Sequence, residues 1–286
     1  MTRTLIASDL DRTLIYSAAA APSGGLAPDL PDPDGPGTAG LVAVERHEGR
    51  DVSFMTRAAA TSLAELAGRH LVVPVTTRTA AQLARVRLPG PAPRYAIAAN
   101  GGVLLVDGVP DPAWTSAVER AVAAVAPLGA ALAELTGLCR PEWAGQPRVA
   151  ADLFCHVLVD RPAVPAGAVE QLTAWARAGG WSVSLQGRKL YLVPQPLQKS
   201  AAAAEVARRV GADVVLAAGD SLLDVDLLAA ADRGVHPGHG EIAASGWSAP
   251  WVDALSSTGA AAGEQVIDWF TTHAGTAGPR ARATAR

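Results

Sequence analysis

Two aspartates near the start of the chain have a spacing that could support acid–base and nucleophilic chemistry. Asp9 and Asp11 form a DxDxT pattern with Thr13, directly after the apolar run 4–8. Residues two apart in an extended chain point to the same side, so both carboxylates are expected to face one pocket. Two close acids must share a proton or be neutralised by a cation. One could then attack as a nucleophile while the other moves a proton, although short acidic patterns also occur by chance.

A second acidic pair, Asp220 and Asp224, lies in the sequence GDSLLD before a predicted helix. The i, i+4 spacing places both carboxylates on one side of the first helical turn. Mg²⁺ prefers hard oxygen ligands of this kind. Acids at a helix start are also favoured by the helix dipole alone. The pair by itself is therefore compatible with a metal site or with simple helix capping.

Thr76 and Lys199 are candidates for holding a phosphoryl group. Thr76 follows the apolar run 71–75, and its hydroxyl and backbone N–H could grip a phosphoryl oxygen; helix capping is the alternative. Lys199 precedes a predicted helix at 200–210, where its ammonium could neutralise a phosphate and Asp9; a solvated lysine is the alternative. Arginine outnumbers lysine 22 to 2. Because a guanidinium cannot replace a compact ammonium everywhere, this scarcity favours a function for the lysine.

The elements that must position these residues alternate between strand and helix at both ends of the chain. Strands are predicted at 4–8, 71–75, 95–99, 214–218, 234–236 and 251–252, and helices at 57–67, up to 85, at 200–210, after 220 and at 262–270. This alternation predicts an α/β fold with one doubly wound parallel sheet. Ligands bind such sheets at the carboxyl ends of the strands, where Asp9, Thr76 and Asp220 are expected to converge.

The middle of the chain has a different order of predicted helices and strands. Two helical stretches precede a strand at 153–159, a helix at 166–178 and paired strands at 182–185 and 189–193, which predicts an inserted α+β unit. A hairpin is also predicted at 41–45 and 52–55, after a long loop or mobile lid at 17–40. We therefore predict a core domain at 1–110 and 196–275, a cap domain at 111–195 and a disordered tail at 276–286.

The composition narrows the classes of partner. A net charge of −3 with 18% charged residues gives no basic field for nucleic acid or an anionic membrane. Cys139 and Cys155 are the only cysteines and have no metal-ligand spacing. The N-terminal apolar run is too short for a signal peptide, and charges interrupt the apolar stretch 117–138. We expect a cytoplasmic protein; the sequence leaves its oligomeric state open.

In chain order these residues resemble the four signature motifs of the haloacid dehalogenase (HAD) superfamily. The matching positions are Asp9-x-Asp11-x-Thr13, Thr76, Lys199 and Gly219-Asp220-x-x-x-Asp224, and the resemblance spans about residues 1–110 and 196–270. The insertion between the second and third motifs resembles the Cof-type and sucrose-phosphatase-like branch, which carries an α/β cap there. Asn100-Gly101-Gly102 and the segment 237–241 also look like later loops of that branch.

The resemblance implies a phosphatase acting on a small phosphorylated metabolite, either a sugar phosphate or a nucleotide-like monoester. Asp9 would form an aspartyl-phosphate, and Asp11 would protonate the leaving alcohol and then activate water. Thr76 and Lys199 would hold the transferring oxygens.

The implied cofactor is Mg²⁺. It would be bound by the carboxylate of Asp9, the backbone carbonyl of Asp11 and Asp220, with Asp224 supporting it directly or through water.

The sequence departs from the family pattern in two places. Arg12 stands where many relatives have glycine, and the usual Thr-Gly-Arg reads Thr76-Thr77-Arg78. The second departure leaves open which threonine grips the phosphate; the position after the strand favours Thr76. The candidates for substrate contact are Arg12, Arg78, Asn100, Gln186, Arg188 and Lys189, with less support for Arg148 and His156. For the three in the paired strands, a solvated turn is equally compatible.

Two other functions remain compatible with the sequence. A phosphosugar mutase would share the fold and the cap type. A noncatalytic binding or regulatory protein would not need all of the acids, but Asp9, Asp11 and Asp220 are all present. The chain also resembles HAD proteins encoded among tellurite-resistance-type stress genes, a context that favours a nucleotide- or ribose-linked phosphate.

Overall fold

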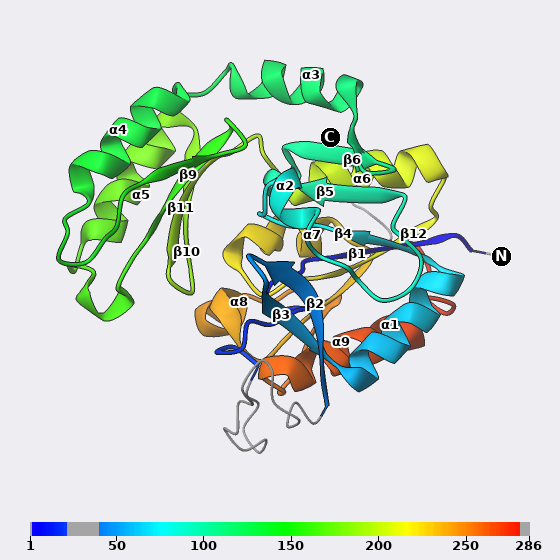
Figure 1. Cartoon of the computed structure of the whole chain (residues 1–286). Helices are drawn as coiled ribbons and strands as arrows, with labels where there is room; N and C mark the ends of the chain where they lie inside the picture. Colours follow the sequence, from blue (N-terminus) through cyan, green and yellow to red (C-terminus); the bar gives the residue numbers. More distant parts are fainter. Residues whose placement is uncertain (1, 22–39, 281–286) are drawn as a thin grey trace.

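The core of the protein is a five-stranded parallel sheet, seen in a computed structural model that describes residues 2–21 and 40–280 (Figure 1). Its strand order is β14-β13-β12-β1-β4. The strands are β1 (Thr4–Ser8), β4 (Leu71–Pro74), β12 (Val214–Ala218), β13 (Arg233–His236) and β14 (Val252–Ala254). An isolated parallel bridge between Val75 and Ile97 joins β5 (Tyr95–Ala98) to the β4 edge. The predicted parallel sheet is confirmed.

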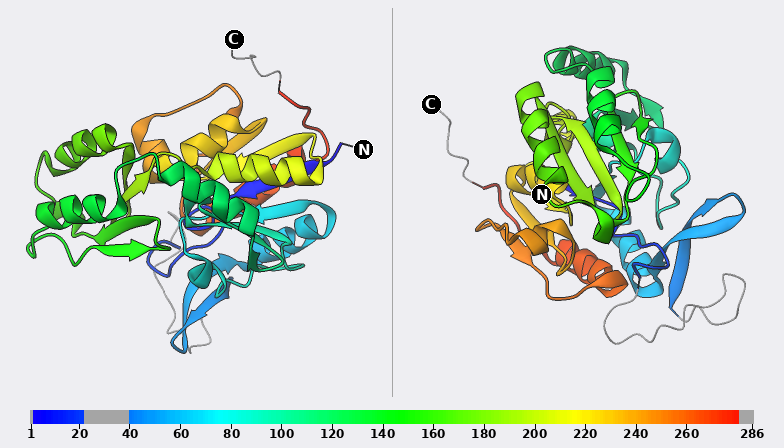
Figure 2. Two further views of the ribbon diagram at one scale, coloured as in Figure 1. Left: turned by 90° about the horizontal axis from the view of Figure 1, so that it is seen from above. Right: turned by 90° about the vertical axis from the view of Figure 1, so that its left-hand side faces the viewer.

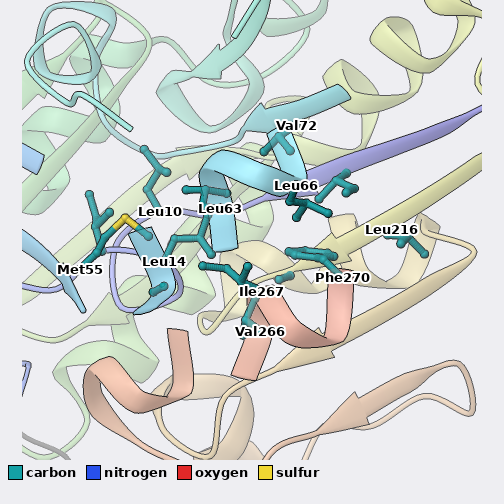
Figure 3. Packing of buried hydrophobic residues seen from close by; sticks show 14 of the residues in the cluster. Leu10, Leu14, Met55, Leu63, Leu66, Val72, Leu216, Val266, Ile267 and Phe270 are labelled. Atoms are coloured by element: carbon teal, nitrogen blue, oxygen red, sulfur yellow. The ribbon is translucent and has the colours of Figure 1, made fainter. Parts of the chain in front are cut away.

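Helices cover both faces of this sheet. Accordingly, the side chains on both faces of its strands are apolar and buried. Ile6 of β1 belongs to one apolar cluster, whereas its neighbours Leu5 and Ala7 belong to another. The first cluster packs under α1 (Arg57–Arg69) and α9 (Gly259–His273), and Figure 3 shows Leu63, Leu66, Ile267 and Phe270 meeting there. The second packs under α6 (Lys199–Val210) and α7 (Val225–Ala230). The sheet is therefore doubly wound.

Smaller elements lie outside the five-stranded sheet. They are α2 (Ala80–Leu83), α8 (Gly240–Ser245), the strands β6 (Val103–Val106) and β7 (Val109–Pro110), and the short 3₁₀ turns Ala99–Gly101, Arg161–Ala163 and Leu222–Asp224. The predicted hairpin is formed by β2 (Leu41–His47) and β3 (Arg50–Thr56), and Figure 2 shows it standing out from the core. Thr56 caps α1 by accepting the N–H of Ala59 at 3.0 Å, as the sequence predicts.

The segment between the two halves of the core forms a second sheet, which lies beside the first (Figure 1). It contains α3 (Pro112–Val122), α4 (Leu128–Leu138), β8 (Arg148–Ala150), β9 (Phe154–Leu158), α5 (Ala168–Gly179), β10 (Trp181–Gln186) and β11 (Lys189–Pro194). The four strands pair antiparallel in the order β10-β11-β9-β8. α4 and α5 cover the face turned away from the core. We call this segment the inserted unit; its independence as a domain stays a prediction.

The predicted loop and tail lie only partly within the described residues. Residues 22–39 of the loop and 281–286 of the tail fall outside them. Residues 276–280, predicted as disordered, are packed instead, because the Arg280 guanidinium lies 3.5 Å from the ring centroid of Trp251. The backbone N–H of Arg280 also donates to Asp232 at 2.9 Å. Among the described helices, none is long and apolar enough to cross a membrane.

Candidate active site

The carboxyl ends of β1, β4 and β12 bring Asp9, Thr76 and Asp220 to one edge of the core sheet. β1 pairs with both neighbours in parallel, so the residues that follow the three strands emerge side by side. The N–H of Asp9 donates to the carbonyl of Ala218 at 2.9 Å, which fixes where the first loop leaves the sheet. The predicted convergence on one edge is therefore present in the structure.

Lys199, the first residue of α6, is a fully buried cation at this edge. Its ammonium donates to Asp9 Oδ1 at 2.6 Å and to Asp224 Oδ1. Burial alone would lower the pKa of this ammonium, but the carboxylates of Asp224 and Asp9 outweigh burial and raise it. Lys199 is therefore a permanent positive charge beside Asp9.

The loop at Asn100 and Gly101 supports the backbone that leads into Lys199. Asn100 is buried and its side-chain amide donates to the carbonyl of Leu197 at 2.9 Å. Gly101 has φ +92°, and a methyl group there would overlap the carbonyl of Gln198. In this structure the side chain of Asn100 holds the start of α6, and its contact with a substrate stays a prediction.

Three carboxylates gather around Lys199. Asp9, Asp220 and Asp224 are all buried and offer oxygen atoms within 4.8 Å of one another. Burial and the neighbouring Asp224 raise the pKa of Asp9 to about 7, although Lys199 opposes the change. Burial and both other acids also raise the pKa of Asp220 well above its ordinary value. Within residues 2–21 and 40–280, the cations paired with this cluster are Lys199 and Arg12, so three acidic side chains share two cations.

This donor set fits a divalent cation. It consists of hard carboxylate oxygens and carries an excess of negative charge that burial makes costly. Asp9 accepts from Lys199 and, at 3.3 Å, from the hydroxyl of Thr13, and Asp220 is paired with Arg12, so a cation would have to join or replace these contacts. Both oxygens of Asp224 already accept hydrogen bonds, from Lys199 on one side and from Asp220 N–H, Ser221 N–H and Ser221 Oγ on the other.

Gly219 explains how Asp224 reaches this position. A methyl group at residue 219 would lie 2.5 Å from Asp224 Cγ, so only glycine lets the carboxylate fold back against the end of β12. The Asp224 carboxylate then caps the turn that carries Asp220. In the Gly219-Asp220 pair of the motif, the glycine therefore matters as well as the acid, because it makes room for the Asp224 carboxylate.

Asp11 lies at the mouth of the site and is held by an arginine. Arg78 donates from Nε and Nη2 to the two oxygens of Asp11, both at 2.7 Å. Its third nitrogen donates to Glu45 Oε2 at 2.7 Å, and Glu45 also accepts from Ser53 at 2.6 Å and Arg85 at 3.1 Å. Burial favours the protonated acid of Glu45, but the bonds from Ser53 and the two arginines lower its pKa. Glu45 of the β2–β3 hairpin thus holds the Arg78 guanidinium, which in turn holds the Asp11 carboxylate.

Arg12 also has a partner within the site. Its backbone is left-handed, with φ 65°, and its guanidinium Nε lies 3.2 Å from Asp220 Oδ2. His239 lies against the carbonyl of Arg12 at 2.7 Å. Arg12 therefore forms an ion pair with a candidate metal ligand and also lines the cavity described below; its contact with a substrate stays a prediction.

A cavity of about 1020 Å³ opens above these residues, between the core and the inserted unit. From the core it is lined by Asp11, Arg12, Thr77, Arg78, Asp220 and Glu241, and from the inserted unit by Arg148, Phe154, His156, Arg161, Gln186, Arg188, Lys189 and Tyr191, among others. Asp9 and Lys199 lie behind this lining. Thr76 is fully buried and its hydroxyl accepts the N–H of Arg78 at 3.1 Å, whereas Thr77 faces the cavity.

Three hydrogen bonds, made by Glu241 and Gln186, tie the inserted unit to the core beside the cavity. Glu241 accepts from Ser184 Oγ at 2.8 Å and from the N–H of Leu185 at 3.0 Å, both on β10. Gln186 donates to Ser221 Oγ at 3.0 Å, next to Asp220. Gln186 therefore joins the two units as well as lining the cavity. Neither Glu241 nor Glu45 has a predicted role: the family resemblance includes Glu241 only as part of the segment 237–241, and no local pattern distinguishes Glu45 from a surface glutamate.

No protein-family model matches the sequence, and no curated protein matches it by sequence. The fold, in contrast, matches solved structures over nearly the whole chain. The sucrose-phosphatase from Synechocystis sp. PCC6803, solved with sucrose and phosphate, has a TM-score of 0.64 at 18% identity and covers 95% of this chain and 99% of its own. The chain has the HAD fold.

Two further HAD phosphatases give the same result. A phosphatase of the superfamily from Bacteroides thetaiotaomicron has a TM-score of 0.53 at 16% identity, with 96% of each chain covered. A sugar phosphatase of HAD subclass IIB has a TM-score of 0.55 at 13% identity, covering 96% of this chain and 99% of its own. The fold expected from the motifs is confirmed, and the match includes the inserted unit.

Proposed function

We propose that this protein is a Mg²⁺-dependent phosphatase that hydrolyses a small phosphate monoester through an aspartyl-phosphate on Asp9. The observation that carries the proposal is the Asp9–Lys199–Asp224 arrangement, with Asp220 beside it, at the carboxyl edge of the sheet. A buried ammonium that touches a buried carboxylate prepares one site for both a nucleophile and an anion. The fold match to phosphatases of the HAD superfamily is consistent with this chemistry.

In the first half of the reaction, a carboxylate oxygen of Asp9 attacks phosphorus and the bond from phosphorus to the leaving oxygen breaks. Lys199 stabilises the equatorial phosphoryl oxygens, with the hydroxyl of Thr76 or the Thr77 backbone beside it. Asp11 gives its proton to the leaving oxygen, which requires it to leave the salt bridge with Arg78. Mg²⁺, held by Asp9, Asp220 and the Asp11 carbonyl and supported by Asp224, would neutralise the approaching charges.

In the second half, Asp11 accepts a proton from water while the water oxygen attacks the same phosphorus. The bond from phosphorus to Asp9 breaks, and Asp9 returns as a carboxylate. The Arg78 guanidinium, 2.7 Å from each Asp11 oxygen, holds this carboxylate at the mouth of the site. An acid–base group in this position contributes about 10²–10⁴-fold to the rate.

The test is phosphate release from p-nitrophenyl phosphate, sugar phosphates and nucleotides, with Mg²⁺ or with excess chelator. Asp9→Asn should abolish release, because the amide is a poor nucleophile and a weaker metal ligand. Asp232→Asn is the matched control, since both aspartates are 5% exposed but Asp232 bonds the N–H of Val215, at the opposite end of the strands. Release that survives in Asp9→Asn would overturn the proposal, and equal release with chelator would remove Mg²⁺ from it.

A further inference from the structure

The cavity face of the inserted unit is built from residues that the strand register places on one side. Arg148 pairs with His156 across β8 and β9, and His156 pairs with Tyr191 across β9 and β11. Directly opposed residues point to the same face of an antiparallel sheet. All three line the cavity, while their neighbours Cys155 and Leu192 are fully buried on the other face. This face is thus a formed wall of the cavity.

The wall carries positive charge without negative charge. Its cations are Arg148, Arg161, Arg188 and Lys189, and no acid of the inserted unit lines the cavity among the described residues. Within residues 2–21 and 40–280, none of the four cations takes part in an ion pair, whereas the core cations Arg12 and Arg78 are both paired with carboxylates. The positive charge of the wall therefore remains open to a ligand.

Arg148, Arg161 and Lys189 line this cavity and not a smaller hollow, and of these Arg148 and Lys189 act on the pKa of His156 in the middle of the wall. Arg188 also borders the smaller hollow, which Glu142 and Asp160 line. Arg148 and Lys189 both lower the pKa of His156, which burial lowers further, so the imidazole between them is neutral at neutral pH. Two fixed cations thus flank a neutral, half-buried ring.

The same ring belongs to an aromatic platform. His156 and Tyr191 have ring centroids 5.6 Å apart, and those of Tyr191 and Phe154 are 6.2 Å apart. The Nδ1 of His156 is buried without a hydrogen-bond partner among the described residues. A buried polar atom of this kind is expected to meet a partner when a ligand binds. The wall therefore places mutually tilted, largely buried aromatic rings beside its cations, where a compact leaving group could meet both.

We propose that Arg148 and Lys189 form a subsite for a second anionic group, a phosphate or a carboxylate, on the leaving group of the substrate. This inference rests on the proposed function, in which Lys199 and the acid cluster take the transferred phosphoryl group. Lys199 and the acid cluster do not neutralise the positive charge of the wall. A substrate such as a sugar bisphosphate or a phosphorylated sugar acid would satisfy both ends of the cavity, whereas a neutral sugar phosphate would leave the wall unpaired.

Two substrate pairs test the subsite and separate the two sources of charge. Fructose 1,6-bisphosphate against fructose 6-phosphate tests a second phosphate, and 3-phosphoglycerate against glycerol 3-phosphate tests a carboxylate. In at least one pair, we expect kcat/KM to favour the member with the additional anionic group by about tenfold or more, as charged hydrogen bonds of this kind provide. The pair that shows the preference identifies the anionic group.

Variants then assign the preference to the wall. Lys189→Gln and Arg148→Gln should each reduce it by about tenfold. Arg177→Gln is the matched control, because Arg177 is an exposed arginine on α5, outside the cavity, and should leave the preference unchanged. Equal kcat/KM within both pairs would overturn the subsite, and so would a preference that survives the Lys189→Gln, Arg148→Gln double variant.

Calorimetric binding keeps this test separate from the test of catalysis. The Asp9→Asn variant should bind fructose 1,6-bisphosphate more tightly than fructose 6-phosphate, or 3-phosphoglycerate more tightly than glycerol 3-phosphate, even without turnover. If the wild-type protein releases no phosphate from any ester, the proposed function fails, whatever the binding data show. If it releases phosphate but neither pair shows a preference in kinetics or binding, only the subsite fails.

Discussion

Replacing Arg12 should strengthen the binding of Mg²⁺ to this protein. Its guanidinium lies 3.2 Å from Asp220 Oδ2, where it neutralises a carboxylate that we assign to the metal site. A metal ion that uses Asp220 must first displace this cation. The Arg12 side chain is 42% exposed, so solvent screens the pair and limits its contribution to about 1 kcal/mol. Arg12→Ala and Arg12→Gly should therefore each lower the Kd for Mg²⁺ about fivefold.

The two variants should differ in stability without bound metal. Alanine retains the cost of a left-handed residue at φ 65°, which glycine avoids, so Arg12→Gly should be more stable than Arg12→Ala by about 1 kcal/mol. Both lose the pair with Asp220, which can take up a proton because its pKa is raised. Stability should be compared in chelator, where metal does not contribute.

The assay is thermal unfolding at increasing Mg²⁺ concentration, checked by calorimetric titration of Mg²⁺ without substrate. Binding to the folded state raises the midpoint in proportion to ln(1 + [Mg²⁺]/Kd), so Kd can be obtained without turnover. Arg233→Ala is the matched control, because its pair with Asp253 is also 3.2 Å long and 40% exposed on the arginine side. An unchanged or higher Kd in both Arg12 variants would refute the displacement argument.

Two further predictions test the support of the site. Gly219→Ala should destabilise the protein by about 1–3 kcal/mol, because the new methyl group lies 2.5 Å from Asp224 Cγ. Calorimetry should show a midpoint lowered by several degrees, and an unchanged midpoint would contradict the close packing. Glu241→Gln should weaken the contacts with Ser184 and Leu185 by about 1–2 kcal/mol. Hydrogen exchange should then be faster at the Leu185 amide, and unchanged protection there would show that Glu241 does not tie the two units.

Apolar runs, and the residues that end strands or cap helices, made much of the core sheet predictable. β1 and β12 have the predicted bounds, because each is a short apolar run that ends at a glycine or serine before an aspartate. The helix at 57–69 begins where its capping threonine stands. Such signals are local, and they required no knowledge of the packing around them.

Contacts between distant segments could not be predicted in the same way. The bonds from Arg78 to Asp11 and Glu45 join residues 67 and 33 positions apart, and nothing near Glu45 in the sequence distinguishes it. The motif predicts that Asn100 contacts substrate, but not that its side chain holds the chain before Lys199. The spatial direction of a side chain depends on tertiary contacts that a motif does not contain.

The wall formed by Arg148 and Lys189 could not be predicted either, because it depends on the register of the inserted sheet. Arg148 and Lys189 lie 41 positions apart in the chain, and only the pairing of β8, β9 and β11 places them on one face. A shift of one residue in any strand would have turned its side chains to the opposite face. The sequence named both residues as candidates but could not show that they share a wall.

The near absence of lysine has a practical consequence for chemical labelling. The chain contains two ε-amines, and Lys199 is fully buried while Lys189 is exposed at the cavity. An amine-reactive dye should therefore attach to one side chain, apart from the N-terminal amine. A fluorophore at Lys189 would report directly on whatever enters the cavity, without any engineered cysteine.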